Sequence, residues 1–255
     1  MSAMFVFHKK IFGTHYKIER NSILLTVGII VMASIGGLFE ITPLFTIAET
    51  VENDPGMRVY TPLETAGRNI YVREGCYACH SQMIRTLRDE VERYGPYSLA
   101  IESNYDHPML WGSKRTGPDL ARIGEKYSDE WQVAHLANPR ALVPESIMPA
   151  YNRLQLVDAR IHDLDRHLST LRIVGVPYTN EMIANARADA YGQARPDSKE
   201  AAGVAKRYGA ATHIRAFSPL TGKVTEMEAL VAYLQVLGHL TDAAHKMQTS
   251  TGSTP

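Results

Sequence analysis

The stretch Cys76-Tyr77-Ala78-Cys79-His80 constrains the fold and chemistry of this chain more than any other. In a C-x-x-C-H motif, two thiols bind one haem c covalently and the following histidine ligates the iron. Cys76 and Cys79 are the only two cysteines in 255 residues, which excludes a larger disulfide framework. The alternatives are a redox dithiol or half of a zinc site, but the βαβ pattern of a thioredoxin-like dithiol is missing. We therefore expect a covalent haem c at Cys76 and Cys79, with His80 as axial ligand.

An uncharged stretch near the N-terminus predicts a membrane anchor. Residues 1–20 are polar and basic, whereas residues 21–39 carry no charge and acidic residues follow. As a helix, those nineteen residues would span about 28 Å, close to the roughly 30 Å of a bilayer core. A basic flank stays in the cytoplasm, so we expect an anchor at 21–45 with the rest of the chain outside. A cleaved signal peptide is the alternative, but the run is long for one and lacks a clear cleavage site.

The remaining sequence divides into a linker, a haem domain and a tail. Residues 46–60 read as an extended linker, 61–240 as the haem domain and 241–255 as a disordered polar tail. Within the domain, residues 192–222 mix glycine, proline and charge without periodicity and predict a loop insertion. The formal net charge is zero, so nothing indicates a nucleic-acid partner.

Two capping boxes predict the first and last helices of this domain. Thr61 with Glu64 begins a helix that leads to Cys76, and Thr225 with Glu228 begins another with apolar residues at helical spacing. Gly67 is costly within a helix and predicts a close helix contact. We expect the two helices to cross there, as the first and last helices cross in cytochromes c.

Further helices are expected between these two. One begins at Ser128 and continues to about Ala137, where Asn138-Pro139 ends it. Another begins at Thr179 or Asn180 and continues to about Tyr191. The predicted fold class is therefore all-α, with a single N-terminal transmembrane helix followed by a cytochrome c-like haem domain.

Met148 is the predicted sixth ligand of the haem iron. It lies in the loop Pro144-Glu145-Ser146-Ile147-Met148-Pro149, and Pro149 favours an extended conformation at Met148. Met83 and Met109 are weaker candidates. On the other side of the haem, Pro118 of Gly117-Pro118 offers a carbonyl that could accept a hydrogen bond from His80, which would orient the imidazole and strengthen it as a ligand.

Several stretches outside the haem motif resemble one family, the membrane-anchored mono-haem subunit (subunit II, the O subunit) of cbb3-type cytochrome c oxidases. The similar stretches are Arg73-Glu74-Gly75, Ser81-Gln82-Met83-Ile84-Arg85, Tyr105-Asp106-His107-Pro108, residues 111–122, Asn138-Pro139-Arg140, Met148-Pro149 and residues 232–238. Among these, the block from Trp111 to Arg122 is much more specific than the haem motif alone.

This resemblance implies a subunit of a terminal oxidase in a bacterial cytoplasmic membrane, with its haem domain in the periplasm. One implied partner is a catalytic subunit with two b-type haems and copper, where oxygen is reduced to water. The other is a di-haem cytochrome c subunit, which supplies the electrons. The resemblance also implies a calcium ion shared with the catalytic subunit, and we match Ser113 to that site through its carbonyl oxygen. No catalytic site of its own is expected in this chain.

Trp111, Lys114 and Arg115 form a candidate docking surface for the catalytic subunit. Large amphipathic rings are enriched at interfaces, and the two cations could pair with haem propionates or with carboxylates of the partner. Alternatively, Trp111 belongs to the core and the two cations are solvated. For the whole chain, the alternatives are the mono-haem subunit of a nitric oxide reductase and an anchored haem sensor or assembly protein.

Overall fold

The computed structural model describes residues 15–46, 56–112, 114–218 and 222–241, which belong to two separate units. The first unit ends at Asn53 and the second begins at Asp54. The regular elements of the described residues are helices, and the only β pairing among them is an isolated bridge between Asp158 and Thr225. The prediction of an all-α fold is confirmed.

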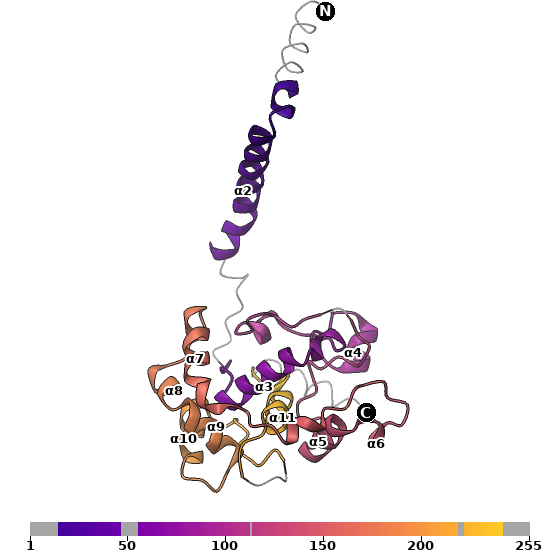
Figure 1. Ribbon diagram of the computed structural model, residues 1–255, viewed down its shortest axis with the longest axis vertical. Coiled ribbons are helices and arrows are strands. Elements are labelled where there is room, and N and C mark those ends of the chain that lie inside the picture. Colours follow the sequence, from indigo (N-terminus) through magenta and orange to yellow (C-terminus); the bar gives the residue numbers. More distant parts are fainter. Residues whose placement is uncertain (1–14, 47–55, 113, 219–221, 242–255) are drawn as a thin grey trace, which may run out of the picture. The chain divides into compact units, whose positions relative to one another are not determined.

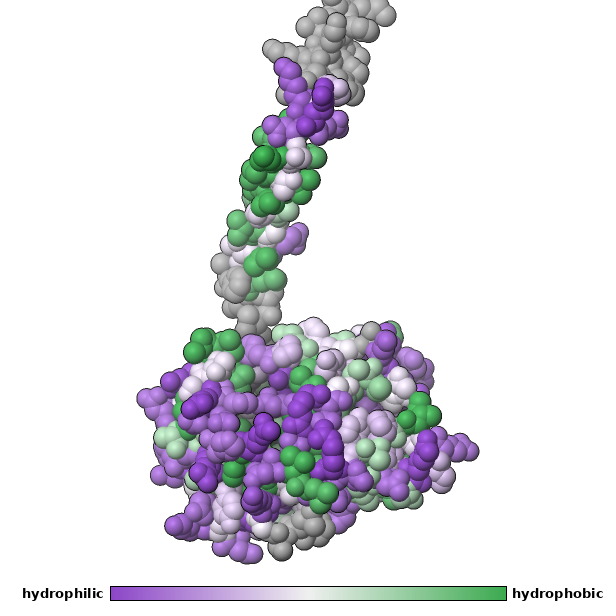
Figure 2. All heavy atoms as spheres, viewed as in Figure 1, coloured by the Kyte–Doolittle hydropathy of each residue, from purple (hydrophilic) through white to green (hydrophobic). Residues whose placement is uncertain are grey.

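The first unit contains helix α2, which extends over Ser22–Thr46 (Figure 1). Its segment Ser22–Leu44 has 23 residues, and an 18-residue window within it has a mean hydropathy of 2.3. Such a helix is about 35 Å long, enough to cross a bilayer core. Apolar side chains are exposed along it (Figure 2), which fits a membrane anchor. The cytoplasmic location of its N-terminal flank stays a prediction.

Two helices, α3 (Pro62–Arg73) and α11 (Glu226–Val236), pack across one another at the centre of the second unit (Figure 1). Both begin with the predicted capping boxes, which satisfy backbone N–H groups of the first turn. A Cβ atom on Gly67 would lie 1.9 Å from the carbonyl oxygen of Ala229, so only glycine permits this approach. The predicted crossing over Gly67 is confirmed.

Shorter helices surround this pair. Ser128 caps α5 (Asp129–Ala137), as predicted, and Thr179 caps a helix that the sequence extended to about Tyr191. The structure divides that helix into α8 (Asn180–Ala184) and α9 (Ala186–Ala194). The others are α4 (Arg88–Tyr94), α6 (Pro139–Leu142), α7 (Leu164–Ile173), α10 (Ala201–Tyr208), and the 3₁₀ turns η2 (Cys76–Ala78), η3 (Ala100–Ser103), η4 (Asn152–Gln155) and η5 (Ile161–Asp163).

Two helical segments interrupt the predicted loop at residues 192–222, although most of its described residues lie outside helices. Helix α9 continues to Ala194, and α10 occupies residues 201–208 with Ala201, Val204 and Tyr208 buried on one face. No side chain caps α10, so the usual start signal is missing from its sequence. The segment also contributes to the core, because buried Gln193 accepts a 2.5 Å hydrogen bond from Thr61 at the start of α3.

Candidate haem site

Helix α3 ends at Arg73, three residues before the first cysteine of the C-x-x-C-H motif. Gly75 follows the helix with a positive φ of 72°, which turns the backbone into η2. Cys76 is half-buried, Cys79 is exposed, and neither forms a disulfide. Burial raises the pKa of the Cys76 thiol to about 12. This thiol is therefore protonated at neutral pH, unlike the activated thiolate of a redox dithiol.

Zinc would need ligands beyond these two thiols and His80. The described residues contain no cluster of three or more His, Cys, Asp or Glu side chains with metal-binding geometry. The geometry thus gives no support to a zinc site, the alternative that the motif alone left open.

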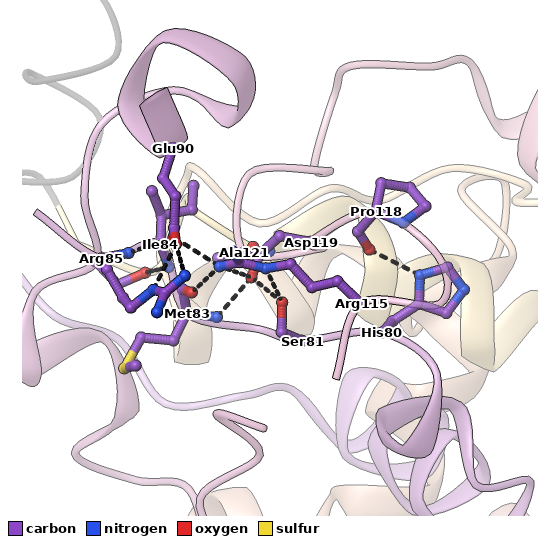
Figure 3. A network of polar contacts seen from close by, with 11 residues as sticks. His80, Ser81, Met83, Ile84, Arg85, Glu90, Arg115, Pro118, Asp119 and Ala121 are labelled. Atoms are coloured by element: carbon purple, nitrogen blue, oxygen red, sulfur yellow. Dashed lines mark hydrogen bonds and ion pairs between the residues drawn. The ribbon is translucent and has the colours of Figure 1, made fainter. Parts of the chain in front are cut away.

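The imidazole of His80 is oriented by the backbone of a distant loop. Its Nδ1 lies 2.8 Å from the carbonyl oxygen of Pro118 (Figure 3). A carbonyl only accepts, so Nδ1 carries the proton and Nε2 keeps a free lone pair for a metal. Gly117 packs against the same ring, where an added Cβ would lie 2.2 Å from Cε1 of His80. The Gly117-Pro118 pair therefore supplies both close approach and a hydrogen-bond acceptor.

The loop that carries Met148 is tied to helix α5 and to its own turn. The backbone N–H of Tyr151 donates to Leu136 at 2.8 Å, and that of Met148 donates to the Ser146 hydroxyl at 3.2 Å. Met148 is half-buried and packs against the same core as Cys76. Both alternatives are less suitable, because Met109 is 53% exposed and the side chain of Met83 extends away from His80 (Figure 3). The sixth ligand stays a prediction.

Two buried polar atoms beside the motif test whether a haem fits here. The Tyr71 hydroxyl and His135 Nδ1 are buried without a hydrogen-bond partner among the described residues. Burial and nearby Cys76 raise the pKa of Tyr71, whereas burial and nearby His80 lower the pKa of His135. An unpaired buried polar atom costs about 1–3 kcal/mol, so a bound group with polar edges would offset this cost. The residues present therefore fit a haem.

Sequence reasoning did not identify His135 or the polar role of Tyr71. Tyr71 lies in the predicted helix that begins at Thr61, and its sequence context shows only helical spacing. His135 lies in a predicted helix and stacks on Trp131 with ring centroids 4.7 Å apart, a contact between successive turns. Its proximity to His80 depends on tertiary structure.

The candidate docking residues lie in different environments. Trp111 is 39% exposed, and its indole N–H donates to the hydroxyl of Ser103 at 3.0 Å. Lys114 is exposed, whereas the guanidinium of Arg115 binds residues within the domain. Arg115 thus has an internal role that the sequence did not suggest. The proposed calcium residue Ser113 lies outside the described residues.

A cavity of about 280 Å³ lies away from the motif, between α3, α7 and the segment 105–107. Its lining includes Tyr60, Arg68, His167 and Tyr178 but no residue of the predicted haem site. The haem site is consequently not this cavity.

One family model matches residues 15–241 and is described as cytochrome C oxidase, mono-heme subunit/FixO. The match includes α2, the C-x-x-C-H motif, the Gly117-Pro118 turn, Met148 and α11. No curated protein matches the chain.

Proposed function

Because the chain belongs to the FixO family of mono-haem cytochrome c oxidase subunits, we propose that it is the electron-transfer subunit of a cbb3-type oxidase. Membership makes it a component of an oxidoreductase complex with a haem cofactor and further subunits. The match to an oxidase family also favours this function over a nitric oxide reductase subunit or a haem sensor.

The geometry of His80 carries the proposal. Its Nδ1 is bound 2.8 Å from the Pro118 carbonyl oxygen, which leaves Nε2 available as an axial ligand. Cys76 and Cys79 would hold haem c through thioether bonds, and His80 and Met148 would ligate its iron. When bound, haem c supplies one-electron chemistry between ferric and ferrous iron. Because His80 and Met148 would both ligate the iron, the site would carry electrons rather than bind a substrate.

The proposed direction of electron flow follows from the family. Electrons would enter from a di-haem cytochrome c subunit and leave to a b-type haem of the catalytic subunit, where oxygen is reduced to water. Exposed Trp111 and Lys114 are the docking residues that we propose for the catalytic subunit, while the guanidinium of Arg115 binds Glu90 within the domain. A calcium ion bound partly through Ser113 would join the same two subunits.

Helix α2 would anchor this subunit in the bacterial cytoplasmic membrane, with the haem domain in the periplasm. The basic residues before the helix favour this orientation. Mass analysis of the mature chain tests the anchor, since residues 1–40 should still be present. A mature N-terminus beyond Phe39 would contradict it.

Purification from solubilised membranes tests the proposed function directly. We expect the full-length chain to retain haem stain on a denaturing gel and to purify with a subunit that holds b-type haem and copper. Cys76→Ala and Cys79→Ala should weaken or remove the stain, with Met83→Leu as a control that leaves both thiols intact. A wild-type chain without covalent haem, or one that purifies without such a partner, would contradict the proposal.

A further inference from the structure

A buried carboxylate joins the segment after His80 to the segment after Pro118. Asp119 Oδ2 accepts from the Ser81 hydroxyl at 2.6 Å and from the backbone N–H of Met83 at 2.9 Å (Figure 3). Its Oδ1 accepts from the backbone N–H of Ala121 at 2.8 Å. Only 6% of Asp119 is exposed, so these three donors replace the water that the charge loses on burial.

Arg115 extends this connection to helix α4. Its Nε donates to the Ser81 hydroxyl at 2.7 Å, and its Nη2 donates to Glu90 at 2.7 Å and to the Met83 carbonyl at 3.0 Å. Ser81 therefore accepts from Arg115 and donates to Asp119 at once. Glu90 is buried and also accepts from the backbone N–H of Arg85 at 2.9 Å. The carboxylates of Asp119 and Glu90 are balanced by the guanidinium groups of Arg115 and Arg85, so the network carries no net charge.

Backbone hydrogen bonds fix the same two segments on both sides of the histidine. The N–H of Gly117 donates to Cys79 at 2.9 Å, and the N–H of Leu120 donates to Ser81 at 2.9 Å. His80 and Pro118 lie between these bonds, so their relative position depends on both. The side chains of Asp119 and Arg115 hold the far end of this pairing in place.

We propose that Asp119 and Arg115 are positioning residues for the axial histidine. They fix the segment after His80 and thereby maintain the hydrogen bond between Nδ1 and Pro118. Such a bond orients the ring and makes the imidazole a stronger donor to a metal. This inference rests on the proposed function, because it concerns the strength of His80 as a haem ligand.

Two replacements separate geometry from charge. Asp119→Asn keeps the shape, but its amide can no longer accept from all three donors, and the N–H of Met83 or Ala121 loses its partner. Ser81→Ala removes the hydroxyl between Asp119 and Arg115 without changing any charge. The matched control is Asp189→Asn, because Asp189 of α9 is fully buried and pairs with Arg207 of α10. The described hydrogen bonds of Asp189 do not involve residues 79–83 or 115–121.

The readout is the proton on His80 Nδ1 in the full-length reduced protein. We expect proton NMR to show that it exchanges with solvent at least about tenfold faster in Asp119→Asn and Ser81→Ala than in wild type. The haem reduction potential should rise in both variants, since a weaker donor stabilises ferric iron less. Asp189→Asn should leave exchange and potential unchanged even if it unfolds more easily.

Three other outcomes are informative. A potential that rises only in Asp119→Asn would indicate a charge effect and overturn the positioning role. Unchanged proton exchange in a haem-loaded Ser81→Ala protein would also overturn it, even if Asp119→Asn failed to fold. A wild-type chain without covalent haem would instead contradict the proposed function, so the two failures can be distinguished.

Discussion

Replacing Gly117 by alanine tests the close packing between this loop and the imidazole of His80. The added Cβ would lie 2.2 Å from Cε1 and 2.7 Å from Nδ1 of the ring. Ordinary contacts begin near 3.4 Å, so ring and loop must separate by at least 1.2 Å, the difference between 3.4 and 2.2 Å. A shift of this size would lengthen or bend the 2.8 Å hydrogen bond to Pro118 until it is lost.

The expected cost follows from these distances. Overpacking of this kind costs about 1–3 kcal/mol, and a lost hydrogen bond costs about 0.5–1.5 kcal/mol. The two costs overlap, because the movement that relieves the clash is the movement that breaks the bond. We therefore expect the free energy of unfolding to fall by about 1–3 kcal/mol, or roughly fivefold to more than a hundredfold in the folding equilibrium.

Urea unfolding of the full-length protein in detergent, followed by haem absorbance, measures this cost. The control is Gly36→Ala in helix α2, where the added Cβ would meet no atom within 4 Å. Alanine suits a helix better than glycine, so the control should match wild type or be more stable by up to about 1 kcal/mol. If Gly117→Ala were as stable as the control, with the His80 Nδ1 proton still protected, the inferred packing would be wrong.

Three further predictions concern the iron, the charge network and the partner. Met148→His should keep six-coordinate iron, lower its potential and remove the weak sulfur-to-iron absorption, whereas Met83→Leu should change none of these in a visible spectrum and redox titration. Hydrogen bonds from Arg115 and Arg85 hold the pKa of the Glu90 carboxyl well below its ordinary 4.5. The charged carboxylate therefore stabilises the folded state fully above pH 4.5, and this stabilisation is lost as the pH falls from 4.5 towards the lowered pKa. Acid unfolding should therefore depend less on pH in Glu90→Gln than in wild type, while exposed Glu92→Gln should behave like wild type. Trp111→Ala should reduce co-purification with the catalytic subunit and keep the haem spectrum. Its control is Tyr97→Ala, because Tyr97 is similarly exposed. Normal assembly of the Trp111→Ala variant would place the docking surface elsewhere.

Much of the helical framework could be predicted because its signals are local. A capping box needs four consecutive residues, and both Thr61–Glu64 and Thr225–Glu228 form one. Gly67 could be predicted as a contact because glycine has no other advantage within a helix. Helix α10 lacks a capping side chain, and its stability depends on burying Val204 and Tyr208 against other elements. Such a helix is determined by tertiary packing, which composition over 192–222 does not reveal.

The haem motif could be predicted from five adjacent residues, but the network around it could not. Asp119 and Ser81 are 38 positions apart, and both are residue types common in loops. Nothing in the sequence distinguishes Arg115, which binds inside the domain, from Lys114, which is exposed. Tertiary structure determines which residues pair in such a network. From the sequence alone, Arg115 was therefore predicted to lie in a docking surface.

The three residues Gly117-Pro118-Asp119 show how the local and distant contributions combine at one site. Gly117 lets the backbone approach the imidazole, because any side chain would enter the ring's space. Pro118 has no backbone N–H of its own and presents its carbonyl to His80. Asp119 then fastens the turn to the segment after the histidine through Ser81 and Met83. The sequence revealed the first two contributions as a Gly-Pro turn, and the third explains why that turn stays against the ring.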